Sequence, residues 1–99
     1  MNNPKYVMFI ERGKTYNRIK QELVVRHVDF IRKLDDGGKM ALCGAFKGYP
    51  GVAGMIVMQN VSREKADALC QTEPFIAGGY ATYKLRELHA GTRENNYLL

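Results

Sequence analysis

The chain lacks the features that mark membrane and secreted proteins. Its 99 residues contain no apolar run close to the about 20 residues that a membrane-spanning helix needs. The opening residues, MNNPKYVMFIERGK, lack the basic-then-apolar order and the small-residue cleavage site of a signal peptide. We therefore expect a cytoplasmic protein that does not contact a membrane.

The chain also has little that could hold a metal ion or a cofactor. Cys43 and Cys70 are its two cysteines, and their spacing fits neither a zinc site nor a redox pair. We interpret both as small core residues. A phosphate-binding glycine loop and a dinucleotide fingerprint are missing as well. We expect an activity that uses no metal and no cofactor.

Basic residues are in excess, but they do not cluster. The 15 Lys and Arg residues exceed the 10 Asp and Glu residues, which gives a net charge of +5. No run of five basic residues occurs, and the aromatic-basic strand motif of many RNA-binding domains is missing. This pattern disfavours a nucleic-acid partner and favours a small anionic or phenolic molecule as the substrate.

Hydrophobic periodicity and turn residues divide the chain into four strands and two helices. Asn17 or Thr15 can cap the first helix, Gly37 and Gly38 can end it, and Ser62 can cap the second helix. The predicted strands are residues 5–11, 39–46, 53–60 and 80–88, and the predicted helices are residues 17–36 and 62–71.

The order β-α-β-β-α-β predicts an α+β fold. With right-handed crossovers it gives a ferredoxin-like antiparallel sheet with both helices on one face. No linker or repeat interrupts the chain, so we expect one domain over residues 1–99, with its core at 5–90 and a tail at 91–99. The small size and the apolar end Tyr97-Leu98-Leu99 predict a homodimer.

His27 is the polar residue that disturbs an otherwise apolar helix face. At about 100° per residue, the apolar residues of the first helix fall in an arc of roughly 140°, and His27 lies near its centre. An unpaired buried polar group costs about 1–3 kcal/mol, so the ring needs a hydrogen-bonding partner. His27 is therefore either a satisfied core histidine or a functional one.

Glu73 is the candidate partner of His27. In this fold the segment after the second helix leads back toward the last strand, where Glu73 and His27 can approach each other. A carboxylate on one imidazole nitrogen fixes the tautomer and favours the other nitrogen as a general base. The alternative for Glu73 is a solvent-facing position before a turn.

Several segments in this order resemble the YciI-like (YCII-related) proteins over residues 5–90. They are the strand KYVMFIE, the helix segment RHVDFI around His27, the strand end Cys43-Gly44-Ala45 and the segment TEPFIAGG around Glu73. The resemblance implies a ferredoxin-like dimer related to dimeric α+β barrels. It also implies a pocket in which His27 and Glu73 are the catalytic pair.

The chain departs from the family at one position of that pair. The family usually has aspartate before the proline of this segment, and Glu73 is longer by one methylene. Glu73 could therefore orient His27 with a shifted backbone or contact the substrate directly. The further candidates for substrate binding are Arg12, Gly44, Phe9 and Phe75.

Three functions compete on these observations. The first is a small acid-base enzyme, because the family and its barrel relatives include a dehydrochlorinase of chlorinated hydroxyquinols and muconolactone isomerases. The resemblance thus implies a lyase or isomerase that acts on a hydroxylated aromatic catabolite, with or without chlorine on the ring. The second is a non-catalytic module that binds or senses a small anion through His27 and Glu73. The third, nucleic-acid binding, is disfavoured by the missing strand motif.

Overall fold

The structure is a computed structural model that describes residues 3–99. Its strands are β1 (Lys5–Arg12), β2 (Met40–Ala45), β3 (Val52–Met58) and β4 (Ala81–Leu88). Its helices are α1 (Gln21–Asp36), α2 (Arg63–Thr72) and α3 (Pro74–Ala77), with the short 3-10 helices η1 (Tyr16–Arg18) and η2 (Asn96–Leu98). The predicted order of the long elements is confirmed, and α3 is an addition to it.

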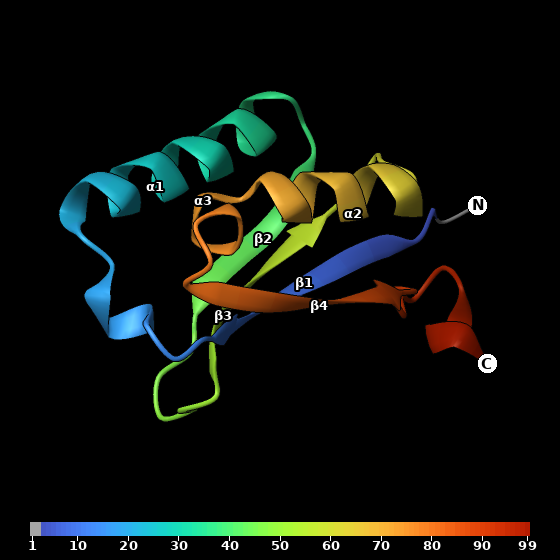
Figure 1. Ribbon diagram of the computed structural model, residues 1–99. Coiled ribbons are helices and arrows are strands. Elements are labelled where there is room, and N and C mark those ends of the chain that lie inside the picture. Colours follow the sequence, from blue (N-terminus) through green and yellow to red (C-terminus); the bar gives the residue numbers. More distant parts are fainter. Residues whose placement is uncertain (1–2) are drawn as a thin grey trace.

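The strands form one antiparallel sheet in the order β2-β3-β1-β4 (Figure 1). β1 lies between β3 and β4, and its Phe9 pairs with Met55 on one side and with Lys84 on the other. Each β-α-β crossover therefore passes over one intervening strand. The ferredoxin-like α+β fold expected from the sequence is confirmed.

The helices cover one face of this sheet (Figure 1). Tyr6, Met8 and Ile10 of β1 point into the core on that face and are at most 6% exposed. Cys70 of α2 belongs to the same core, where burial, aided by the charge of Asp67, raises the pKa of its thiol to about 12. The interpretation of Cys70 as a small core residue agrees with this environment.

The opposite face of the sheet carries its own apolar residues. Val7 and Phe9 alternate with the core residues of β1, and they pair with Val57 and Met55 of β3. Leu42 of β2 is 57% exposed. No helix among residues 3–99 covers this face (Figure 1).

The predicted start of the first helix at residue 17 is wrong. Residues 16–18 form η1, and Ile19 then takes an extended conformation (φ −63°, ψ 126°) that separates η1 from α1. Lys20 precedes α1, and no side-chain hydrogen bond caps the helix, so neither Asn17 nor Thr15 has the predicted capping role. The packing of the loop before α1 overrides the helical pattern there.

The other predicted helix boundaries agree with the structure. Ser62 caps α2 by accepting a hydrogen bond from the backbone N–H of Lys65, and α1 ends at Gly37 and Gly38, of which Gly38 has a φ of +71°. In the described part of the chain, no helix has the length and apolar character that crossing a membrane requires.

Candidate active site

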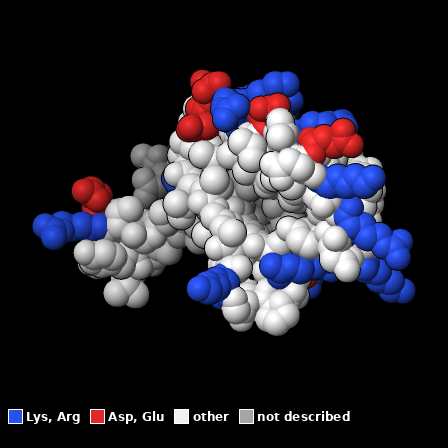
Figure 2. Space-filling view, turned by 90° about the vertical axis from the view of Figure 1, so that its left-hand side faces the viewer, with Lys and Arg blue, Asp and Glu red and all other residues white. Residues whose placement is uncertain are grey.

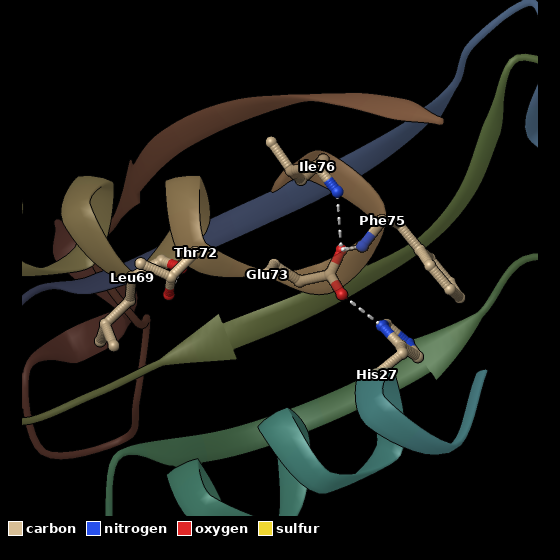
Figure 3. A network of polar contacts seen from close by, with 6 residues as sticks. All are labelled: His27, Leu69, Thr72, Glu73, Phe75 and Ile76. Carbon is tan, nitrogen blue, oxygen red and sulfur yellow. Dashed lines mark hydrogen bonds and ion pairs between the residues drawn. The ribbon is translucent and has the colours of Figure 1, made fainter. Parts of the chain in front are cut away.

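Glu73 links the two helices that follow β3. It ends α2 and caps α3, because its Oε1 accepts hydrogen bonds from the backbone N–H groups of Phe75 (3.0 Å) and Ile76 (3.3 Å) (Figure 3). Pro74 occupies the first turn of α3, where its missing N–H and fixed φ suit a helix start. The Glu73 side chain is completely buried, so its carboxylate is held in one place by the backbone around it.

His27 of α1 meets the second oxygen of the same carboxylate. Its Nδ1 lies 2.7 Å from Oε2 of Glu73, and its side chain is 17% exposed (Figure 3). The ring also stacks on Phe75, with the ring centroids 4.2 Å apart and the planes 9° from parallel. The sequence therefore correctly predicts that these two residues come within hydrogen-bonding distance.

The bonding around Glu73 favours one orientation of the imidazole proton. Both backbone groups on Oε1 are donors, and a Glu73 carboxylate in its ionised form only accepts, which makes Nδ1 of His27 the donor to Oε2. In the neutral ring, Nε2 then carries a lone pair. Among the residues that the structure describes, Nε2 of His27 has no hydrogen-bond partner.

A cavity of about 160 Å³ lies beside His27, between α1, η1, α3 and the sheet. Its walls are mostly apolar, from residues such as Ile10, Ile31, Ile56 and Phe75. It is smaller than the roughly 300–1,000 Å³ of sites for drug-sized ligands, and its size suits a single ring. Glu73 does not line this cavity, so its position favours orientation of His27 over direct contact with a ligand.

The predicted substrate-binding residues divide into two groups. Gly44 and Phe75 line the cavity. A Cβ atom at Gly44 would have no neighbour within 4 Å, whereas one at Gly54 would clash with the carbonyl oxygen of Gly44. Close contact between β2 and β3 therefore requires glycine at 54, a position that the sequence analysis did not single out.

Phe9 and Arg12 do not reach the cavity. Phe9 is not among the residues that line the cavity, because side chains alternate along β1 and Ile10 takes the cavity side. The Arg12 guanidinium donates to the carbonyl oxygens of Tyr49 (2.9 Å) and Pro50 (2.8 Å), which anchors it to the β2–β3 loop. Phe9 and Arg12 were predicted to bind the substrate, but neither residue lines this cavity.

Two cavity residues were missed as candidates for binding. Cys43 was interpreted as a core residue, and the structure places its side chain, partly exposed, in the cavity wall. Tyr16 lies between the predicted strand 5–11 and the predicted helix 17–36, and it lines the cavity from η1. The Gly13-containing loop around Tyr16 carries no periodic pattern, so its packing against Phe75 was not readable from the sequence.

The end of the molecule from which Tyr16 lines the cavity is basic. Residues 12–20, which connect β1 to α1, contain Arg12, Lys14, Arg18 and Lys20 and no acidic residue. Figure 2 looks onto this end, and Lys and Arg side chains dominate the lower and right-hand parts of the view. A positive field of this kind raises the local concentration of anions.

A larger groove of about 490 Å³ lies between α2 and β4. Some of its charged groups have partners: Arg63 donates to Glu87 (2.6 Å), and the Tyr83 hydroxyl nearby donates to Asp67 (2.5 Å). The bond to Asp67 raises the pKa of Tyr83. Within residues 3–99, no group of three His, Cys, Asp or Glu side chains is placed to hold a metal ion.

Comparison with known proteins identifies relatives of the fold. The model of the YCII-related domain matches residues 5–89. One solved structure, 5-chloro-2-hydroxyhydroquinone dehydrochlorinase from Burkholderia phenoliruptrix AC1100 in complex with 2,5-dihydroxybenzoquinone, has a TM-score of 0.73 and 12% identity. The match covers 88% of this chain and 95% of the dehydrochlorinase. No curated protein matches the chain in sequence.

Proposed function

Because this chain belongs to the YCII-related family, we propose that it is a small acid-base enzyme in which His27 is the general base. One observation carries the proposal. Nδ1 of His27 lies 2.7 Å from a buried carboxylate, Nε2 has no hydrogen-bond partner among residues 3–99, and His27 lines a ring-sized cavity. A base that is oriented by a second group and placed beside a cavity is the arrangement that proton abstraction requires.

Glu73 acts in this proposal as a positioning residue. Its Oε1 is occupied by two backbone N–H groups and its Oε2 by His27, so each oxygen already has a partner. The carboxylate stabilises the imidazolium that forms when Nε2 takes a proton. The longer glutamate side chain spans the distance from the start of α3 to α1.

The proposed substrate is a hydroxylated aromatic ring, with a chlorinated trihydroxybenzene as the first to test. The cavity size and its apolar walls suit one ring, and the basic residues of 12–20 favour a phenolic anion. A structural neighbour that shares the fold carries 2,5-dihydroxybenzoquinone. These three observations support a lyase or isomerase of aromatic catabolites.

The dehydrochlorination balances as a loss of HCl. One hydroxyl proton moves to the ring carbon that bears chlorine, and that oxygen becomes a carbonyl. Nε2 of His27 then takes a second hydroxyl proton while the C–Cl electron pair leaves with chloride. The product is a hydroxybenzoquinone, and neither an oxidant nor a reductant is consumed. An isomerisation would use the same base to move a proton between two ring carbons.

Turnover tests the proposal directly. Chloride release and ring absorbance are followed with a chlorinated hydroxyquinol, and a muconolactone serves as the isomerase substrate. Chloride release or isomerisation that depends on His27 supports the proposal that the protein is an acid-base enzyme. A protein that binds the ring at the cavity but converts none of these substrates would instead be the small-anion-binding module, which the basic segment 12–20 also suits.

We also propose that the uncovered face of the sheet pairs with a second copy of the chain. Phe9, which is partly exposed, and Leu42, which is 57% exposed, are apolar residues there that one 99-residue copy leaves accessible to solvent. Sedimentation at micromolar concentration should show twice the chain mass of 11.2 kDa. Leu42→Glu should give the monomer, whereas Val28→Glu on the exposed side of α1 should not. A wild-type monomer would contradict this proposal.

A further inference from the structure

The cavity wall contains few groups that could bind the oxygen atoms of a ring. Of its side chains, the imidazole of His27, the hydroxyl of Tyr16 and the weakly polar thiol of Cys43 carry hydrogen-bonding groups. The remaining lining residues are hydrocarbon residues, glycines and a methionine. Tyr16 is therefore the strongest hydrogen-bonding side chain in the cavity besides His27.

Three contacts hold the ring of Tyr16 in place. The ring meets Phe75 edge to face, with the centroids 5.9 Å apart and the planes at 80°. The Arg12 guanidinium lies 5.4 Å from the Tyr16 ring centroid, at cation–π distance. The backbone N–H of Tyr16 donates to the carbonyl oxygen of Gly13 at 3.2 Å.

Gly13 fixes the loop from which Tyr16 extends. Its N–H donates to the carbonyl oxygen of Tyr80 at 3.0 Å. A Cβ atom at Gly13 would lie 2.7 Å from the same oxygen, so a larger residue would push the loop away from β4. The position of Tyr16 is thus set by the sheet edge, Phe75 and Arg12 together.

The hydroxyl of Tyr16 has no partner of its own. In the described residues 3–99 it makes no hydrogen bond, whereas the hydroxyl of Tyr83 donates to Asp67 at 2.5 Å. This hydroxyl is accessible to solvent, because no buried side-chain nitrogen or oxygen atom of residues 3–99 lacks a hydrogen-bond partner, so a ligand oxygen can replace water on it. The rings of Tyr16 and His27 both contact Phe75, and all three residues line the cavity.

We propose that Tyr16 is a substrate-binding residue that hydrogen-bonds a second oxygen of the ring whose proton His27 takes. This inference rests on the proposed function and narrows its substrate class to single rings with at least two oxygen substituents. A site built to bind an oxygen discriminates against the ring that lacks it, because the hydroxyl is then left without a partner. Arg12 contributes by holding the ring of Tyr16 and not by touching the ligand.

Ligand titrations of Tyr16→Phe test this inference. The probes are 2,5-dihydroxybenzoquinone, which has several ring oxygens, and phenol, which has one. Tyr16→Phe keeps the ring on Phe75 and under Arg12 and removes only the hydroxyl. We expect the dissociation constant for 2,5-dihydroxybenzoquinone to rise about tenfold, with phenol affinity unchanged within about twofold. During turnover KM should rise more than kcat falls.

Tyr49→Phe is the matched control, because Tyr49 is exposed on the β2–β3 loop and its side chain is outside the cavity. This variant should bind both probes as the wild type does. Equal affinities of Tyr16→Phe and wild type for 2,5-dihydroxybenzoquinone would overturn the role of Tyr16 alone. An equal loss of affinity for both probes in Tyr16→Phe would show that Tyr16 has a structural role, and it would also overturn the proposed binding role. A wild type that binds neither probe would overturn the proposed function and this inference together.

Discussion

The chain contains two histidine–glutamate pairs with almost the same geometry and different surroundings. His27 and Glu73 lie 2.7 Å apart, and His89 and Glu87 lie 2.6 Å apart. The side chain of Glu73 is completely buried, whereas His89 is 56% exposed and Glu87 is 32% exposed. The distance between the two groups therefore does not distinguish a functional pair from a surface pair.

The difference lies in what else holds each carboxylate. Glu73 caps α3 with one oxygen, so the backbone fixes its other oxygen against His27. Glu87 divides its oxygens between His89 and Arg63, both of which are mostly exposed. Water and salt weaken such exposed pairs. His27 of the buried pair lines the mostly apolar cavity of about 160 Å³, whereas Glu87 lines the larger, more charged groove of about 490 Å³. The apolar cavity and the fixed carboxylate make the buried pair the functional candidate.

The largest expected effect comes from removing each histidine. His27→Ala should lower turnover by about 10²–10⁴-fold, because the variant loses its general base. His89→Ala should leave turnover unchanged, since His89 is far from the cavity lining. Steady-state rates, with circular dichroism to show that both variants fold, make the comparison. A folded, fully active His27→Ala protein would return His27 to the role of a core residue.

Replacing each glutamate by its amide tests the orientation of the ring. In Glu73→Gln the amide oxygen still accepts from Phe75 and Ile76, and the amide NH₂ faces Nδ1 of His27. Nδ1 must then accept, which moves the proton to Nε2 and removes the base. We expect kcat to fall about 10–100-fold, less than in His27→Ala. Glu87→Gln should keep the wild-type kcat, and an equal loss in both variants would contradict the comparison.

Truncation of the same residues separates their contributions to stability. Glu73→Ala removes the cap of α3 and leaves the half-buried His27 without its partner, and we expect unfolding free energy to fall by about 3 kcal/mol. Glu87→Ala should cause a much smaller change. Urea denaturation of both variants measures the difference. A Glu73→Ala protein as stable as the wild type would show that the buried pair does not fix this region.

The two cysteines should differ in their reactivity toward thiol reagents, because Cys70 is buried and Cys43 is partly exposed. Cys70 is buried, and its pKa is raised to about 12, so almost no thiolate forms near neutral pH. Cys43 lies partly exposed in the cavity wall. A small thiol reagent should label Cys43 first, and 2,5-dihydroxybenzoquinone should slow the labelling. Preferential labelling of Cys70 would contradict the arrangement of the cavity.

The smallest expected effect is a weak pH dependence at the surface pair. Hydrogen bonds from His89, and then from Arg63, lower the pKa of Glu87 in the folded state. Its contribution to stability is therefore present above its unfolded-state pKa of about 4.3 and is lost as pH falls through the lower folded-state value. The melting temperatures of wild type and Glu87→Gln should differ slightly above about pH 5 and converge in acid. A difference in melting temperature that grows as the pH falls would contradict this prediction.

Local patterns were sufficient to predict the fold. The apolar and aromatic segment 5–11 predicted strand β1, and helical periodicity placed His27 on the inner face of α1. Glycines at 37 and 38 and Ser62 marked the helix ends where the structure has them. These features depend on neighbours in the sequence, so the sequence alone could show them.

The site was predicted only in part, because its remaining features depend on distant residues. The approach of Glu73 to His27 was expected, but the second use of its carboxylate as the cap of α3 was not. Pro74 after Glu73 was the available signal, since proline is common in the first helical turn. The positions of Tyr16 and Arg12 depend on Phe75, Tyr49 and Pro50, which no local pattern connects to them.

Nitrogen-15 NMR of the two histidine rings tests the central claim most directly. The account predicts that neutral His27 carries its proton on Nδ1, with Nε2 bare, because Glu73 accepts the Nδ1 proton. Addition of 2,5-dihydroxybenzoquinone should then shift the Nε2 resonance of His27 and leave the ring of His89 unchanged. A proton on Nε2 of free His27, or a His27 ring that does not respond to the ligand, would contradict the assignment of His27 as the base.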